Sequence, residues 1–146
     1  AMGYGVPAAV AAKAVHPDRP VVCFAGDGCF LMTGQELATA AQYDLPIIVL
    51  VVNNGMYGTI RMHQEREYPG RVSGTGLRNP DFAAYARAFG GHGETVEETG
   101  QFAPAFERAC ASGKPALIEL RIDPEAITPS ATISALREKA LKSQGG

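Results

Sequence analysis

The sequence has 146 residues, 46% of them hydrophobic, which is enough for one compact core but not for two comfortable domains. Its 13 basic and 15 acidic residues are spread along the chain without blocks and give a net charge of −2, so neither a nucleic-acid surface nor an acidic tail is indicated. The longest apolar run, PIIVLVV, is too short to span a bilayer, and the first residues lack the pattern of a signal peptide. We expect one domain over residues 1–146, soluble and cytoplasmic, with no nucleic-acid or membrane partner.

The first half of the chain predicts a helix, a strand, a second helix and a second strand. AMGYGVPAAVAAKAV indicates a glycine turn followed by an Ala- and Val-rich helix with Pro7 near its first turn. The apolar runs at 21–25 and 47–52 predict strands that are covered on both faces. Between them, TGQE at 33–36 has the spacing of a capping box and predicts a helix that runs to about Tyr43.

The second half continues the alternation. GMYGTIRMHQERE predicts a loop that passes into a short helix, and Asn79 with Pro80 predicts the cap and first turn of a helix over DFAAYARAF. A short strand is expected near GETV, a helix around FAPAFERACAS that Gly113 ends, and a strand over PALIELRI. SATISALREKALKSQGG predicts a marginal amphipathic helix with a frayed end. Strands that alternate with helices are typical of an α/β fold, a parallel sheet flanked by helices.

Two polar motifs follow the two most apolar strands. Gly26, Asp27 and Gly28 follow the first strand, and Asn53 and Asn54 follow the second, with 24 residues between Gly28 and Asn53. Ligands bind beyond the carboxyl ends of parallel strands. Asp27 offers an anionic oxygen, Asn54 an amide oxygen and the next turn a carbonyl, which suit Mg²⁺, while Gly28 lets the backbone approach a phosphate. Each motif alone would be an ordinary turn, but together they suit a site for a phosphate and a metal ion.

These motifs and their spacing resemble the diphosphate–metal motif of thiamine-diphosphate-dependent enzymes. AMGYGVPAAVAAK, NPDFAAYARAFGG and GKPALIEL resemble further segments of the acetolactate synthase and pyruvate decarboxylase superfamily, so the resemblance covers almost the whole chain. It implies the thiamine-diphosphate-binding fold, with thiamine diphosphate and Mg²⁺ as cofactors.

The resemblance also implies roles for individual residues. Mg²⁺ would be bound by Asp27, Asn54 and the main-chain oxygen of Met56, and Met2 would hold the cofactor in its bent conformation. His63 lies where the family places residues that face the substrate, although a simple surface role is the alternative. The cofactor-binding residues that the resemblance implies are Met2, Gly26, Asp27, Gly28, Cys29, Asn54, Met56, Tyr57 and Gly58.

The reaction implied is one on a 2-oxo acid, and three functions stay open. The segment from GDG to NN, residues 26–54, is most similar to acetolactate synthases. These enzymes decarboxylate one oxo acid and join the remaining fragment to a second oxo acid. Acetohydroxyacid synthases, however, have tryptophan at the position matching His63 and usually Gly-Met-Val at 58–60. NNGMYGTIR is similar to decarboxylases of the benzoylformate type, which release an aldehyde. The third function is a non-catalytic cofactor-binding or assembly module.

The resemblance is to the C-terminal portion of the family chains only. Those chains also carry a central domain and a pyrimidine-binding domain with an activating glutamate, so we expect a fragment, truncated at its N-terminus, that is inactive alone. The family site lies between this domain and the pyrimidine-binding domain of another subunit, which implies a homo-oligomer. Gly3, Gly5 and Ala8 also fit the dinucleotide pattern G-x-G-x-x-A, but no strand precedes them.

Overall fold

The computed structural model describes residues 1–144, and the chain forms two compact units. The first unit consists of Ala1–Asn53 and Asn79–Arg121, and the second of Asn54–Arg78 and the chain from Ile122 onward. Within the described residues, no helix has both the length and the apolar character that a membrane crossing requires.

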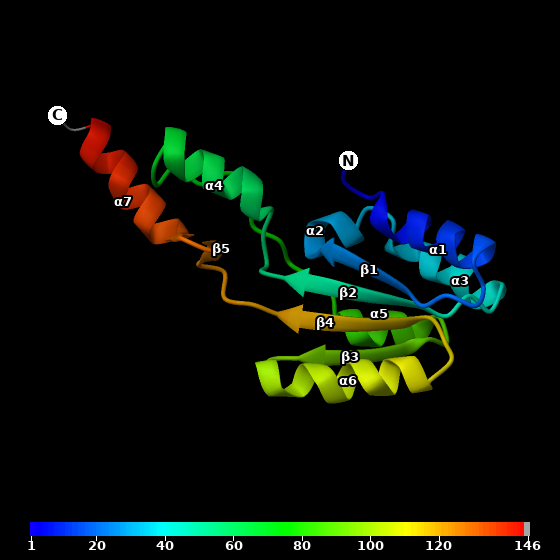
Figure 1. Cartoon of the computed structure of the whole chain (residues 1–146). Helices are drawn as coiled ribbons and strands as arrows, with labels where there is room; N and C mark the ends of the chain where they lie inside the picture. Colours follow the sequence, from blue (N-terminus) through cyan, green and yellow to red (C-terminus); the bar gives the residue numbers. More distant parts are fainter. Residues whose placement is uncertain (145–146) are drawn as a thin grey trace. The chain divides into compact units, whose positions relative to one another are not determined.

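A four-stranded parallel sheet forms the centre of the first unit (Figure 1). Its strands, in spatial order, are β1 (Val21–Gly26), β2 (Ile47–Asn53), β4 (Ala116–Arg121) and β3 (His92–Val96). Because all four strands run in one direction, their carboxyl ends lie at one edge, where Gly26 pairs with Val52 and Asn53 with Arg121. The predicted parallel α/β fold is confirmed.

Helices cover both faces of this sheet. One face packs against α1 (Gly5–Val15), α3 (Leu37–Gln42) and α5 (Phe82–Ala88), and the other against α6 (Thr99–Ala111). On the first face the ring of Phe30 meets the ring of Phe82 edge to face, with 5.5 Å between ring centroids. Both rings are almost fully buried, and burying a side chain of this size contributes roughly 1.5–3 kcal/mol.

Strand β1 is covered on one face only, so the expectation of two covered faces is wrong for it. Cys23 and Ala25 point into the core, whereas Val22 is exposed and Phe24 is 72% exposed. The reason is that β1 is an edge strand and α6 packs over β2, β4 and β3 instead. The expectation holds for β2, which buries Val49 towards one core and Leu50 towards the other.

The predicted capping box at 33–36 does not form. Thr33 Oγ1 donates to the carbonyl oxygen of Gly3 at 2.8 Å, and Glu36 accepts from Thr39 Oγ1 at 2.8 Å. The segment Gly34–Glu36 is a 3₁₀ turn, and α3 follows it. Thr33 is therefore used for a tertiary contact rather than a local cap.

Two other helix starts also differ from the prediction. Asp81, not Asn79, caps α5, and its Oδ1 accepts from the backbone N–H of Ala84 at 2.8 Å. Helix α6 begins at Thr99 because Glu98 and Gln101 form a capping box. A short helix that the sequence did not predict, α2 (Asp27–Phe30), follows β1 directly.

The second unit is built on α4 (Gly58–Glu67) and α7 (Ile133–Gln144), with a small hairpin of β5 (Ala126–Thr128) and β6 (Ala131–Thr132). Both helices were predicted; Gly145 and Gly146, where α7 was expected to fray, lie outside the described residues.

A buried carboxylate joins α4 to α7. Glu65 Oε1 accepts from Arg137 Nη2 at 2.6 Å and from Arg61 Nε at 2.9 Å, while Oε2 accepts from the backbone of Gly70 at 2.8 Å. Hydrogen bonding to Arg137 is the largest cause that lowers the pKa of Glu65, from its ordinary 4.5 to about 2. Glu65 is therefore charged at neutral pH although it is buried.

Candidate functional site

Asp27 lies at the carboxyl end of β1, as predicted, and opens α2. Its side chain is only 2% exposed. Oδ1 accepts from the backbone N–H of Gly28 at 2.9 Å, and Oδ2 accepts from Nδ2 of Asn79 at 2.7 Å. Burying a carboxylate is costly unless hydrogen bonds compensate for the lost water. The contacts therefore keep an anionic oxygen pair at the strand end in one orientation.

Asp27 is one end of a chain of side-chain hydrogen bonds, which we call the strand-end network: Asp27, Asn79, Asn53, Glu119 and Thr95. Asn79 Nδ2 also donates to Asn53 Oδ1 at 2.8 Å, and Asn53 Nδ2 donates to Glu119 Oε1 at 2.6 Å. Thr95 Oγ1 donates to the other oxygen of the buried Glu119 at 2.9 Å. The network thus connects the carboxyl ends of β1, β2, β4 and β3.

The amide of Asn79 can take only one orientation in this network. Its Nδ2 faces two acceptors, Asp27 Oδ2 and Asn53 Oδ1, and an amide group has two hydrogens to donate. The reversed amide would place an oxygen against both. In the orientation observed, and within the described residues, Asn79 Oδ1 is buried without a hydrogen-bond partner, which costs roughly 1–3 kcal/mol.

This arrangement fits a hard cation. No group of three histidine, cysteine or acidic side chains comes together in residues 1–144, so a cation would rely on amide, main-chain or diphosphate oxygens besides one carboxylate. Mg²⁺ is bound in proteins by one or two carboxylates together with phosphates. The buried Asp27 and the unsatisfied oxygen of Asn79 are consistent with such a site.

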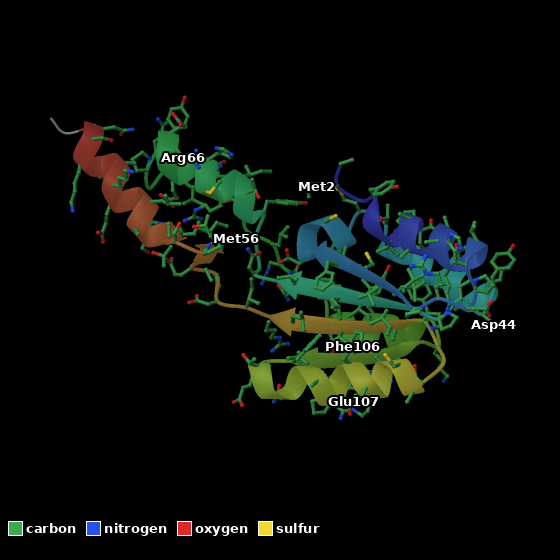
Figure 2. All side chains as sticks on the ribbon, in the orientation of Figure 1. Met2, Asp44, Met56, Arg66, Phe106 and Glu107 are labelled. Carbon is green, nitrogen blue, oxygen red and sulfur yellow. The ribbon has the colours of Figure 1, made fainter. Side chains whose placement is uncertain are left out.

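The other predicted ligands, Asn54 and Met56, belong to the second unit. Asn54 Oδ1 accepts from the backbone N–H of Met56 at 3.1 Å, so the two are held in one turn. Met56 pairs with Gly76 in a short antiparallel bridge, and the N–H of Tyr57 donates to Thr75 O at 2.9 Å. Figure 2 shows Met56 in the loop that precedes α4. These contacts hold the loop in one conformation.

Gly58, the first residue of α4, packs against the side chain of Asn54. A Cβ atom at this position would lie 2.8 Å from Asn54 Nδ2 and 2.8 Å from Ile127 Cδ1. The absence of a side chain at position 58 therefore allows the conformation of Asn54 that is observed.

The turn before α1 is attached to α2. The N–H of Gly3 donates to Cys29 Sγ at 3.2 Å, and Gly3 has a φ of +74°, which favours glycine. Gly5 lies so close to β1 that a Cβ would meet Cys23 Sγ at 2.9 Å. The backbone conformation of Gly3 and the close packing of Gly5 explain why glycine stands at these positions. The hydrogen bond to Cys29 places the segment that carries Met2 next to α2. Met2 itself, which is labelled in Figure 2, lies before α1. It is about half exposed, at 48%.

His63 lies on the exposed side of α4, in the second unit. This position is compatible both with a substrate-facing role and with a surface role, so both alternatives for His63 stay open.

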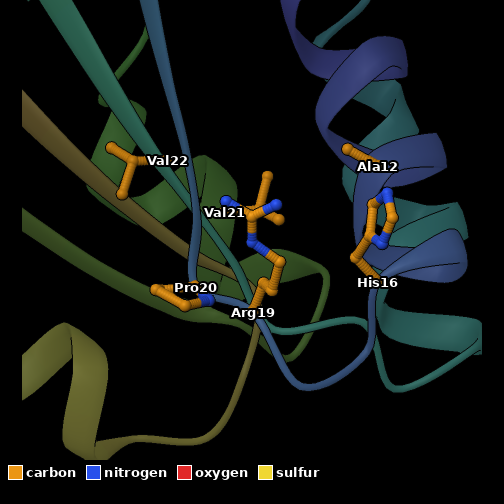
Figure 3. A pocket seen from close by; sticks show the side chains of 6 residues that line it. All are labelled: Ala12, His16, Arg19, Pro20, Val21 and Val22. Carbon is orange, nitrogen blue, oxygen red and sulfur yellow. The ribbon is translucent and has the colours of Figure 1, made fainter.

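A surface pocket of about 270 Å³ opens at the other end of β1 (Figure 3). Its lining comes from the end of α1 and the start of β1: Ala12, His16, Arg19, Pro20, Val21 and Val22. It contains no residue of the strand-end network, and ligands of parallel sheets bind at the carboxyl ends of the strands. This pocket is therefore not the candidate site.

The sequence did not predict a site role for Asn79, Glu119 or Thr95. It indicated Asn53 only as part of the end of a strand. Glu119 carries a usable signal, because a glutamate in the apolar strand PALIELRI needs a buried partner. Asn79 carries none, since Asn before Pro is an ordinary helix cap. Thr95 is equally inconspicuous in sequence.

Comparison with known proteins identifies the family. The family described as thiamine pyrophosphate enzyme, C-terminal TPP binding domain, matches residues 1–120. The acetolactate synthase large subunit of Parasynechococcus marenigrum (strain WH8102) is 42% identical over 123 residues, 83% of this chain and 20% of that protein. The acetolactate synthase isozyme 2 large subunit of Escherichia coli (strain K12) is 37% identical over 144 residues, 94% of this chain and 26% of that protein.

A solved structure agrees with these relatives. The thiamine diphosphate-dependent 4-hydroxybenzoylformate decarboxylase of Rhodococcus jostii RHA1 is similar with a TM-score of 0.78 and 36% identity, over 84% of this chain and 23% of that chain. The chain thus spans about a fifth to a quarter of the length of these proteins. With the family match extending over residues 1–120, the chain belongs to the thiamine pyrophosphate enzymes and corresponds to their C-terminal, cofactor-binding domain.

Proposed function

We propose that this chain holds the diphosphate and Mg²⁺ of thiamine diphosphate in an enzyme that acts on a 2-oxo acid, by decarboxylation and carboligation as in acetolactate synthases. The observation that carries the proposal is the buried Asp27 carboxylate at the end of β1, held by Gly28 and Asn79. Similarity to two acetolactate synthase large subunits supports the choice of reaction.

The residues predicted to bind Mg²⁺ and the cofactor each have a chemical task in this proposal. Asp27 would give a carboxylate oxygen to Mg²⁺, and Asn54 and the main-chain oxygen of Met56 would be the further ligands. Gly26, Gly28, Cys29, Tyr57 and Gly58 would bind the cofactor, and Met2 would support it. The bound cofactor supplies an electron sink for breaking the bond between the carboxylate and the carbonyl carbon of the substrate. The protein contributes position and charge.

A decarboxylase of the benzoylformate type is the second candidate. It is favoured by the similarity to the 4-hydroxybenzoylformate decarboxylase and by His63 in place of the tryptophan of acetohydroxyacid synthases. The two reactions differ in what happens to the fragment that remains after carbon dioxide has left. A decarboxylase releases this fragment as an aldehyde, and a carboligase joins it to a second oxo acid.

The metal site is tested by Asp27→Ala and Asn54→Ala in the full-length protein. Each change removes an oxygen that octahedral Mg²⁺ cannot easily replace, so Mg²⁺-dependent binding of thiamine diphosphate should be abolished in calorimetry. Asp18→Ala, in an exposed loop of the first unit, is the matched control and should bind as the unchanged protein does. Unaltered cofactor affinity in both site variants would contradict the proposal.

The reaction is tested by supplying the full-length protein with a panel of 2-oxo acids and identifying the products. A 2-hydroxy-3-oxo acid from pyruvate would support carboligation, and an aldehyde from an aromatic oxo acid would support the decarboxylase. Cofactor binding with no turnover on any of them would indicate the non-catalytic module instead.

A further inference from the structure

The strand-end network contains a residue that no ligand assignment includes. Asn79 is 52 residues from Asp27 and 26 from Asn53 in the sequence, yet one nitrogen atom of its side chain contacts both at 2.7 and 2.8 Å. It therefore cross-links the end of β1 to the end of β2. Asn53 is the last residue of β2 and directly precedes Asn54 in the sequence.

The remaining members of the network keep Asn53 and Asn79 from rotating. Asn53 uses its oxygen towards Asn79 and its nitrogen towards Glu119, which defines the orientation of its amide. Glu119 is buried and is held in turn by Thr95 at 2.9 Å and by Arg121 Nε at 3.4 Å. Every donor in this series points to an acceptor of defined position, so Asn79 cannot turn without breaking contacts on two strands.

We propose that Asn79 is a positioning residue of the metal site, which orients the Asp27 carboxylate and holds it to the end of β2 at Asn53. This inference rests on the proposed function, because it requires Asp27 to bind Mg²⁺. Partners that orient a metal ligand typically change metal affinity 10- to 100-fold when they are removed. Mg²⁺ demands near-ideal octahedral geometry, whereas Ca²⁺ accepts irregular oxygen ligands. A loss of orientation should therefore weaken Mg²⁺ more than Ca²⁺.

The experiment measures Mg²⁺ and Ca²⁺ affinity of the full-length protein by calorimetry, in the presence of excess thiamine diphosphate. Asn79→Ala and Asn79→Leu both remove the two N–H donors. Because leucine keeps the side-chain volume, the Asn79→Leu variant tests the role of Asn79 if the alanine variant does not fold. We expect Mg²⁺ affinity to fall roughly 10- to 100-fold in both, and the ratio of Mg²⁺ to Ca²⁺ affinity to fall with it.

Asp81→Ala is the matched control. Asp81 lies two residues from Asn79 and caps helix α5, and its side chain accepts from the backbone N–H of Ala84 in that helix. Its loss should lower the melting temperature, as the loss of a helix cap does, and leave Mg²⁺ affinity within twofold. A purely structural role of Asn79 would give the same result as this control.

Asp27→Ala separates the inference from the function on which it rests. If Asp27→Ala abolishes Mg²⁺ binding while both Asn79 variants bind Mg²⁺ within twofold of the unchanged protein, the positioning role is overturned and the metal site stands. An equal loss of Mg²⁺ and Ca²⁺ affinity in the Asn79 variants also overturns it, because orientation would not be what was lost. If Asp27→Ala binds Mg²⁺ normally, the metal site and the role of Asn79 are overturned together.

Discussion

Gly58 is the residue at which the smallest addition would disturb the loop that carries Asn54. A Cβ would come within 2.8 Å of Asn54 Nδ2 and Ile127 Cδ1, which is closer than Cβ atoms approach non-bonded atoms in proteins. Both neighbours are the ends of side chains, which can rotate away. The fold can therefore accommodate the methyl group, but only by moving the Asn54 amide that the proposed function requires.

Gly58→Ala should accordingly leave the full-length protein folded and weaken Mg²⁺-dependent cofactor binding roughly tenfold. Calorimetry with thiamine diphosphate and Mg²⁺ measures the binding, and circular dichroism measures the fold. Gly100→Ala is the matched control, since Gly100 is also in the first turn of a helix and a methyl group there would have no neighbour within 4 Å. If the two alanine variants bind the cofactor equally well, Gly58 does not shape the site.

Single residues also mark where sequence reasoning stops. Asp27 could be predicted because a charged residue at the end of an apolar strand requires a polar partner or a ligand. Asn79 could not, because Asn-Pro has a sufficient local explanation as a helix start and its real partners lie 26 and 52 residues away. Hydrogen bonds over such separations depend on the register of the whole sheet, which one sequence does not give.

At the scale of elements, the pairing of α4 with α7 depends on one buried ion cluster. Glu65 is fully buried, and its carboxylate is bound by Arg137 from α7 and by Arg61 from its own helix. Its pKa is about 2 in the folded chain, against an ordinary 4.5. Since the folded pKa is the lower one, the contribution to stability is complete above pH 4.5 and is lost as the pH falls from 4.5 through about 2.

We therefore expect Glu65→Gln to reduce the free energy of unfolding by roughly 2–3 kcal/mol at pH 7, and the difference from the unchanged chain to narrow below pH 4.5. Urea unfolding followed by circular dichroism between pH 7 and pH 3 measures this. Glu94→Gln is the control: Arg108 also lowers the pKa of Glu94, but that arginine is more than half exposed, so water screens the pair and the effect should be small. A difference at Glu65 that did not depend on pH would exclude the ion cluster as its cause.

The helices and strands that could be predicted are those whose sequence pattern lies within the element itself. The runs VVCFA, IIVLVV and PALIEL are mostly apolar over a full strand length, and all three form strands. Helix α2 was missed because four residues are too few for a periodic pattern. The capping box at Thr33 was wrong because a hydroxyl that matches a local motif can make a tertiary bond instead, here to Gly3.

At the scale of the whole molecule, the first unit exposes large apolar side chains beside the candidate site. Met2 and Tyr4 before α1 are exposed, as are Leu31 and Met32 after α2, and the bond from Gly3 to Cys29 holds these two segments together. Exposed apolar groups that gather in one place indicate a surface that another chain covers. We propose that this surface contacts the pyrimidine-binding domain of another subunit, so that the full-length protein is at least a dimer.

Leu31→Asp should then weaken assembly of the full-length protein roughly tenfold or more, because a buried unpaired charge disfavours an interface. Light scattering at several protein concentrations measures the assembly. Tyr43→Asp is the control, since Tyr43 is also an exposed apolar residue but follows α3, at the amino-terminal edge of the sheet. A full-length protein that is active as a strict monomer would contradict the prediction.

The last prediction is that the 146-residue chain alone has no turnover, even though it carries the predicted contacts to diphosphate and Mg²⁺. Catalysis by a bound cofactor requires a site from which water is excluded, and here Met2 is 48% exposed while Leu31 and Met32 are also open to solvent. The chain spans only 20% to 26% of its acetolactate synthase relatives, so most of the length of those proteins has no counterpart in residues 1–146. Weak binding of thiamine diphosphate with Mg²⁺ is therefore expected without release of carbon dioxide from pyruvate or benzoylformate. The full-length protein, assayed at the same cofactor concentration, is the control. Cofactor-dependent release by the short chain at roughly 1 per second or faster, a rate typical of enzymes, would show that these residues form a complete active site.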